Sequence, residues 1–228
     1  MTHPVVNSKV NSGVTSVALD TELLKSAAGL TLDSSSNTIA PASDKYALGF
    51  GIKHSSDLIY NDQNGFKPVS GTIEHSGTVT FKTDSLGPVT VGDFSVGYNG
   101  DRKSDKTSGF YIKDIAGTGA ILFDVSNPDS LTANSNSLNV GRADLLVAPE
   151  FDRFLNEKGL AQQSIKGADV GDVQLDALSS PVGIGSTSLT IPSFNFPAVE
   201  IPPITIPQPT FSANLPSFGA NFPFEHGH

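Results

Sequence analysis

The sequence has no cysteine and no tryptophan among its 228 residues. The lack of cysteine excludes a disulfide framework, a thiolate nucleophile and a cysteine-ligated zinc site. The lack of tryptophan excludes an indole platform for binding sugars. No apolar run approaches the roughly 18 residues that a membrane-spanning helix requires, so no membrane span is predicted.

Charge is also scarce and mostly of one sign. Only 16% of the residues are charged, and 14 Lys and Arg oppose 23 Asp and Glu, which gives a formal net charge of −9. Such a surface repels phosphate backbones and anionic lipids, so neither nucleic acid nor a membrane surface is expected as a partner. The first ten residues hold one Lys and no apolar block, so no signal peptide is predicted. If the protein is exported, either the sequence is a mature form from which a signal peptide has been removed, or the protein leaves the cell by a route that needs no N-terminal signal.

The composition of the chain changes sharply near Leu178. Residues 1–177 contain all 14 basic residues and 21 of the 23 acidic ones. Residues 178–228 contain no Lys or Arg and only two acids, Glu200 and Glu225. We therefore predict a folded body over residues 1–177 and a separate tail over residues 178–228.

The body consists of short apolar segments separated by turn signals at intervals of about ten residues. Residues 72–74 and 79–81 alternate around Ser76-Gly77, which predicts a β-hairpin. Short strands at this spacing favour a mainly β fold, an antiparallel β-sandwich of jelly-roll-like type, over an α/β fold. The other predicted strands lie within 14–19, 45–53, 89–91, 94–96, 110–112, 120–123, 138–140 and 145–147.

Two short helices are predicted within the body. Thr21 is expected to cap a helix that ends at Gly29. Residues 149–159 begin with proline and end with glycine, as helices commonly do. Phe151 and Leu155 share one face of this second helix, and we expect that face to pack on the sandwich.

The tail repeats an apolar residue followed by proline every five residues, at Ile191, Phe196, Ile201 and Ile206. Proline excludes a helix and removes backbone donors, so an extended Pro-rich tail is predicted. Disordered linkers are usually poor in bulky apolar residues, whereas this tail is rich in them and is expected to bind a partner surface. In a polyproline II conformation 40 residues span on the order of 120 Å, which is enough to reach a neighbouring subunit. The residues that we assign to this assembly contact are Ile191, Pro192, Phe194, Phe196, Pro197, Ile201, Ile204, Ile206, Phe211, Phe218 and Phe222.

Residue types that could bind metal or perform catalysis are present without the spacing that such sites require. The histidines match no zinc motif, and Asp169, Asp172 and Asp176 lack the alternating pattern of an EF-hand calcium loop. There is no GxSxG or Walker motif, and no glycine pair has the context of a dinucleotide fold. The sequence therefore predicts no enzyme, no cofactor and no metal site. A Ser-His-Asp catalytic triad whose members meet only in the folded protein leaves no motif in the sequence. Such a triad would be recognised in the structure by a pocket with converging polar groups.

Six segments of the body resemble, in the same order, a group of secreted cyanobacterial proteins that often carry a C-terminal Pro-Glu-Pro (PEP-CTERM) sorting anchor. The resemblance spans roughly Val14 to Ala177 and implies export and a β-sandwich-like body, without any active site. This chain lacks the sorting tripeptide, the membrane helix after it and the basic end, and the repeat tail stands in their place. The segments are SGTIEHSGTVTF (70–81), VTVGDFSVGY (89–98), SGFYIKD (108–114), ILFDVSNP (121–128), ADLLVAPEF (143–151) and GADVGDVQLDA (167–177).

These features predict an extracellular or cell-surface structural protein. The chain is expected to form a homopolymer, a filament or matrix in which extended terminal segments dock on neighbouring subunits. The alternative is a secreted carbohydrate-binding or adhesion module with an extracellular polysaccharide as its partner. In that case Tyr46, Tyr60, Tyr98 and Tyr111 would supply the stacking faces.

Overall fold

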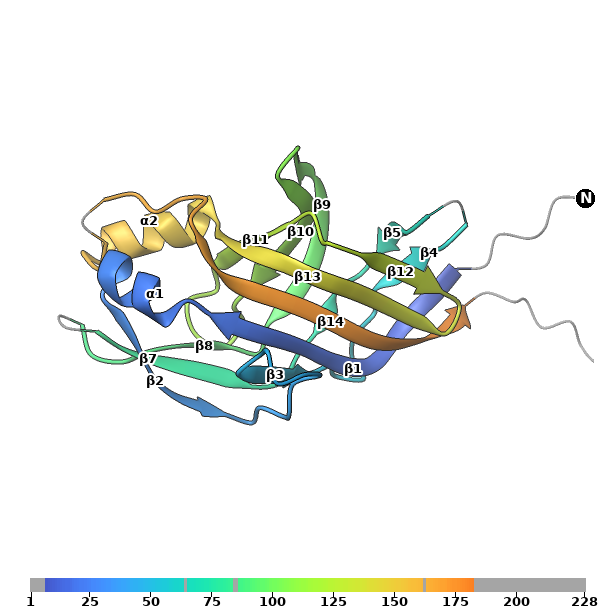
Figure 1. Ribbon diagram of the computed structural model, residues 1–228, viewed down its shortest axis with the longest axis horizontal. Helices are drawn as coiled ribbons and strands as arrows, with labels where there is room; N and C mark the ends of the chain where they lie inside the picture. The colour runs from blue at the N-terminus through green and yellow to red at the C-terminus, as the bar shows by residue number, and fades with distance from the viewer. Residues whose placement is uncertain (1–6, 64, 84–85, 162, 183–228) are drawn as a thin grey trace, which may run out of the picture. The chain divides into compact units, whose positions relative to one another are not determined.

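The computed structural model describes residues 7–63, 65–83, 86–161 and 163–182 (Figure 1). They belong to one compact unit. The residues of the predicted assembly tail, from Ile191 to Phe222, lie outside the described residues.

Most of the described strands belong to one large, curled, antiparallel sheet. Its main path runs in the order β5 (Lys67–Ser70), β4 (Ile59–Asn61), β1 (Asn7–Leu19), β14 (Asp169–Val182), β13 (Ser137–Val147), β11 (Ile121–Ser126), β10 (Thr107–Lys113), β9 (Ser95–Lys103) and β6 (Ile73–Glu74). Two further strands lie off this path: β12 (Leu131–Asn134) pairs with β13, and β3 (Leu48–Gly51) pairs with β1.

A second sheet of three strands packs against one end of the first. Its order is β2 (Leu30–Ser36), β7 (Thr78–Thr83) and β8 (Val89–Gly92). Alternating side chains of both sheets, such as Val79, Phe81, Leu122 and Leu145, fill the space between them. This arrangement confirms the predicted mainly antiparallel β-sandwich with two short helices.

The two longest strands, β1 and β14, form the spine of the large sheet. Their ladder runs from Asn7 opposite Val182 to Leu19 opposite Gly171, with a register shift between Val10 and Ser12. β14 therefore continues through the change in composition near Leu178. The first residue of β1 and the last residue of β14 are ladder partners at one end of the sheet (Figure 1).

Both predicted helices form at the opposite end of this ladder (Figure 1). In α1 (Thr21–Ala28) the cap is Asp20 rather than Thr21, because the Asp20 carboxylate accepts a hydrogen bond from the amide of Leu23 at 2.9 Å. The helix ends at Gly29 with φ 59°, as predicted. α2 (Pro149–Glu157) starts at its proline and buries Phe151 and Leu155.

The predicted hairpin around Ser76-Gly77 is wrong. β6 pairs with β9 in the large sheet, whereas β7 pairs with β2 and β8 in the small one. The chain changes sheets between Glu74 and Thr78, where Gly77 adopts φ 112°. A Cβ at Gly77 would lie only 3.0 Å from the carbonyl oxygen of Asn37, so glycine permits this corner of the sandwich.

Among the described residues no helix is long and apolar enough to cross a membrane.

Candidate functional site

Four aromatic rings from separate parts of the large sheet form a continuous row, which we call the aromatic row. Tyr60 of β4 lies 5.4 Å from Phe66, Phe66 lies 5.7 Å from Phe110 of β10, and Phe110 lies 5.3 Å from Tyr98 of β9, between ring centroids. Tyr60 is buried, whereas the other three rings are half-buried. The row thus crosses from the core to the surface and joins the β4–β5 and β9–β10 hairpins.

An apolar cavity of about 60 Å³, which we call the outer cavity, adjoins this row because Phe110 is part of its wall. Leu131 is 37% exposed, and Phe110, Val140 and Leu175 are half-buried, so the cavity opens toward the surface on this side. Its walls contain no charged side chain. The other lining residues are Thr15, Ile73, Val96, Ser108, Ile112, Val125, Pro128, Leu138, Val173 and Gln174.

A second apolar cavity, of about 50 Å³, lies deeper, between the two sheets. It shares Thr15, Val96 and Ile112 with the outer cavity. An apolar cavity of about 150 Å³ admits a benzene molecule, so neither of these two smaller spaces encloses a molecule of that size. Both walls are almost wholly apolar, which differs from a catalytic pocket with converging polar groups.

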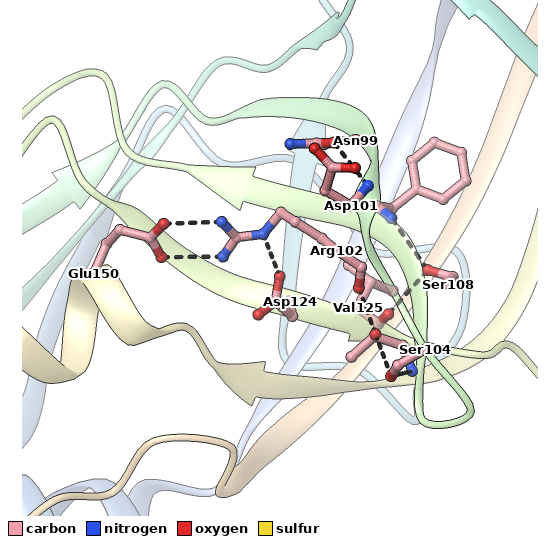
Figure 2. A network of polar contacts seen from close by, with 10 residues as sticks. Asn99, Asp101, Arg102, Ser104, Ser108, Asp124, Val125 and Glu150 are labelled. Carbon is pink, nitrogen blue, oxygen red and sulfur yellow. Dashed lines mark hydrogen bonds and ion pairs between the residues drawn. The ribbon is translucent and has the colours of Figure 1, made fainter.

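Arg102 ties the β9–β10 hairpin to neighbouring elements, and Figure 2 shows it extending between two carboxylates. Its Nε donates to Asp124 of β11 at 2.6 Å, and its two terminal nitrogens donate to Glu150 of α2 at 2.8 and 3.0 Å. The Arg102 guanidinium also lies 5.7 Å from the centroid of the Tyr111 ring. A half-buried, bidentate pair of this kind fixes the orientation of both partners.

The same ion pair shifts the protonation equilibria of both groups. The two hydrogen bonds from Arg102 hold the pKa of Glu150 below its usual range, although partial burial opposes this shift. Glu150 in turn raises the pKa of Arg102. Both groups are therefore charged at neutral pH, and the hairpin is tied to α2 by a charge-assisted contact.

Hydrogen bonds also order the turn of this hairpin (Figure 2). The hydroxyl of Thr107 donates to the carbonyl oxygen of Arg102 at 2.5 Å, and the hydroxyls of Ser104 and Thr107 lie 2.7 Å apart. The hydroxyl of Ser108 donates to the carbonyl oxygen of Val125 on β11 at 2.9 Å. Tyr98 and Phe110 are thus presented by a rigid element, which reduces the entropy lost on binding.

The buried end of the row is fixed in a similar way. The hydroxyl of Tyr60 donates to the carbonyl oxygens of Asn134, at 2.7 Å, and Ser137, at 3.0 Å. These carbonyls flank the turn between β12 and β13, so Tyr60 ties that hairpin to β4. Burial raises the pKa of the Tyr60 hydroxyl, which therefore stays protonated and remains a donor.

His75 lines the deeper cavity and is the buried one of the two described histidines. Its Nδ1 lies 3.1 Å from the carbonyl oxygen of Phe94, and its Nε2 lies 2.7 Å from the hydroxyl of Thr15. Nδ1 must carry the proton, because a carbonyl oxygen only accepts. Burial lowers the pKa of His75 to about 4, so the ring is neutral at physiological pH.

The four tyrosines of the carbohydrate hypothesis do not form one surface. Tyr46 and Tyr60 are buried, Tyr111 lies against Arg102, and only Tyr98 belongs to the partly exposed section of the row. The residues that make the row, Phe66 and Phe110, were not predicted from the sequence. They are distant in sequence, and no motif marks residues that only the sheet brings together.

The three aspartates considered for calcium lie on β14. Asp172 binds Arg142 at 2.6 Å, and Asp176 accepts a hydrogen bond from Gln174. Arg142 also contacts Asp129 and Asp144, so it neutralises part of this acidic face. Within the part of the chain that the structure describes, no three His, Asp or Glu side chains are grouped so that they could hold a metal ion.

The two packed antiparallel sheets place the chain in the class of β-sandwich proteins. No protein-family model matches the chain, and no curated protein matches its sequence. The structure is similar to the crystal structure of the C-terminal domain of HtaA from Corynebacterium glutamicum, with a TM-score of 0.51 and 10% sequence identity. The match covers 76% of this chain and 99% of that domain. A likeness at this identity shows the fold alone.

Proposed function

We propose that the protein is a structural subunit that polymerises outside the cell, through docking of its apolar C-terminal tail on the body of the next subunit. The observation that carries this proposal is the combination of a partly exposed aromatic and apolar surface with a tail rich in proline, isoleucine and phenylalanine. Each would be an exposed adhesive surface without a partner. A single chain carries both, so copies of it are mutually complementary.

The geometry of β14 supports a contact between subunits. The pairing of β14 with β13 ends at Leu178, opposite Ser137, but β14 continues along β1 to Val182. The last described residues before the tail therefore belong to a strand that is anchored in the sheet. A contact between the tail of one copy and the body of another is heterologous and generates a filament when it does not close.

The extracellular location belongs to the same proposal. It rests on the resemblance of residues 14–177 to exported proteins. The similarity to a bacterial sandwich domain is compatible with it.

The test is to remove residues 190–228 and compare both chains by negative-stain electron microscopy and size-exclusion chromatography. We expect filaments from the full chain and a folded monomer from the truncated one, because the body has its own core. A full-length control replaces Ile191, Phe196, Ile201 and Ile206 by serine and should also remain monomeric. Filaments from the truncated chain, or a monomeric full chain at all salt concentrations, would contradict the proposal.

A further inference from the structure

We infer that the aromatic row and the outer cavity form the receptor for the proline repeat of residues 191–210, supplied by a neighbouring copy. This inference rests on the proposed function and names the surface on which the tail docks. The occupant is a segment of this same chain that lies beyond the described residues.

The chemistry of the surface matches that of the repeat. Grooves that bind proline-rich segments are lined by aromatic rings, since these pack on the flat faces of proline in a polyproline II helix. The row offers the half-buried rings of Phe66, Phe110 and Tyr98 for this purpose. The outer cavity beside Phe110 provides Leu131 and Val140 as apolar contacts for the Ile or Phe that precedes each proline.

The dimensions of the surface also agree with those of the repeat. One five-residue repeat in polyproline II spans roughly 15 Å, at a rise of about 3.1 Å per residue. The three half-buried rings of the row are separated by two successive steps, of 5.7 and 5.3 Å between centroids. One repeat is therefore long enough to cover them, and the remaining repeats supply alternative registers or extend past them.

Charge does not oppose this contact. The walls of the outer cavity hold no charged side chain, and residues 191–210 contain only one, Glu200. Almost no ionic group has to lose its water on docking, which would be the largest cost of burying such a surface. The acidic bodies repel one another elsewhere, so the tail, with only two acidic residues, is the segment best able to bridge two copies.

β14 ends at the level of the aromatic row, because Pro181 is the ladder partner of Ser8 and Ser8 pairs with Tyr60. The tail spans on the order of 120 Å in a polyproline II conformation, which is long enough to reach the row of a neighbouring copy. The crosslinking experiment below distinguishes a repeat supplied by a neighbour from the chain's own repeat.

Photo-crosslinking of the full chain tests the inference directly. Phe196 is replaced by p-benzoylphenylalanine, and equal amounts of ¹⁴N- and ¹⁵N-labelled chains are mixed, irradiated and analysed by mass spectrometry. We expect crosslinks between light and heavy chains at Phe66, Phe110, Leu131 or Val140. Crosslinks to another part of the body, or crosslinks only within single chains, would overturn the inference.

Variants of the row provide a second, quantitative measurement. Phe66→Leu and Phe110→Leu should each raise the protein concentration needed for filaments by about tenfold, as loss of an aromatic anchor does at interfaces. The matched control is Phe123→Leu, a half-buried phenylalanine that packs on Phe151 away from the row, and it should leave that concentration unchanged. Circular dichroism checks that all three fold.

The two proposals fail in distinguishable ways. If the full chain forms filaments but both row variants assemble like the Phe123→Leu control, the docking surface is wrong and the proposed function stands. If the full chain forms no filaments, the proposed function fails, and the docking surface fails with it. Retention of the full chain by a polysaccharide column, lost in Phe110→Leu, would mean that the row binds sugar and would overturn the inference.

Discussion

His75 shows how a single residue makes the stability of the sandwich depend on pH. Its neutral ring links Thr15 on β1 to Phe94, where the chain enters β9, and so connects two distant parts of the large sheet. Burial lowers its pKa more strongly than the Phe94 carbonyl and the nearby Glu74 carboxylate raise it, and the charge of Lys53 lowers it further. His75 therefore binds a proton less readily in the folded protein than in the unfolded chain.

This shift predicts a loss of stability in mild acid. The pKa of His75 is about 4 in the folded protein against 6.5 ordinarily. Above pH 6.5 both states are neutral, and below it only the unfolded state binds the proton, so the free energy of unfolding falls until about pH 4. Between pH 7.5 and pH 5 we expect His75 to cost about 2 kcal/mol.

Urea denaturation at both pH values measures this contribution. His75→Gln should lose less stability than the wild type on acidification. His54→Gln, a change at an exposed histidine, should behave like the wild type. An equal loss in the His75→Gln and wild-type proteins would show that the carboxylates alone account for the acid sensitivity.

At the scale of elements, side-chain contacts support the β9–β10 hairpin where its backbone pairing with β6 is short. β6 covers only Val96 and Ser95 of β9, so most of β9 is an edge. Arg102 compensates for the missing strand, because it joins this edge to β11 and α2 at once. The order of half of the aromatic row thus depends on a contact with a helix.

A double-mutant cycle of Arg102→Met and Glu150→Gln should give a coupling free energy of about 1–2 kcal/mol, between the values typical of exposed and of buried ion pairs. Arg102 is 16% exposed and Glu150 37% exposed, which justifies the intermediate value. Chemical denaturation of the four proteins measures it. The exposed pair Arg142–Asp129 is the matched control and should show no measurable coupling. Equal coupling in the two pairs would mean that burial adds nothing to the Arg102 contact.

At the scale of the whole molecule, net charge opposes the proposed assembly, which the tail would promote. Each subunit carries a formal charge of −9, and the predicted contact between subunits is almost uncharged. The Debye length is about 10 Å in 0.1 M salt and about 3 Å in 1 M salt, so added salt screens the repulsion between bodies. Apolar docking does not weaken under these conditions.

We therefore expect the concentration required for filaments to fall as NaCl rises from 20 to 500 mM, by roughly tenfold or more. Light scattering with electron microscopy of the same samples measures this change. Sodium sulfate at equal ionic strength should promote assembly further, because it strengthens apolar burial. Filaments that dissolve in high salt would instead indicate that ion pairs hold the subunits together.

The sequence predicted those features that depend on neighbouring residues. Turn spacing indicated the sandwich, and Pro149 and Gly29 marked the correct ends of helices. The structure around Gly77 could not be predicted correctly. A glycine turn between two strands has the same sequence pattern whether the strands pair with each other or belong to two different sheets. The aromatic row could not be predicted, because it depends on tertiary contacts. These are the pairing of β9 with β10 and the packing of Phe66 on Phe110.

The pairing of Asn7 with Val182 gives the subunit two unlike poles. At one pole the first and last described strands end side by side, and at the other α1 and α2 close the sheet (Figure 1). A polymer that repeats one contact between such subunits inherits this polarity, so its two tips present different surfaces. Growth at one tip then requires a free tail and growth at the other a free receptor, and a cell could cap either tip without blocking the other.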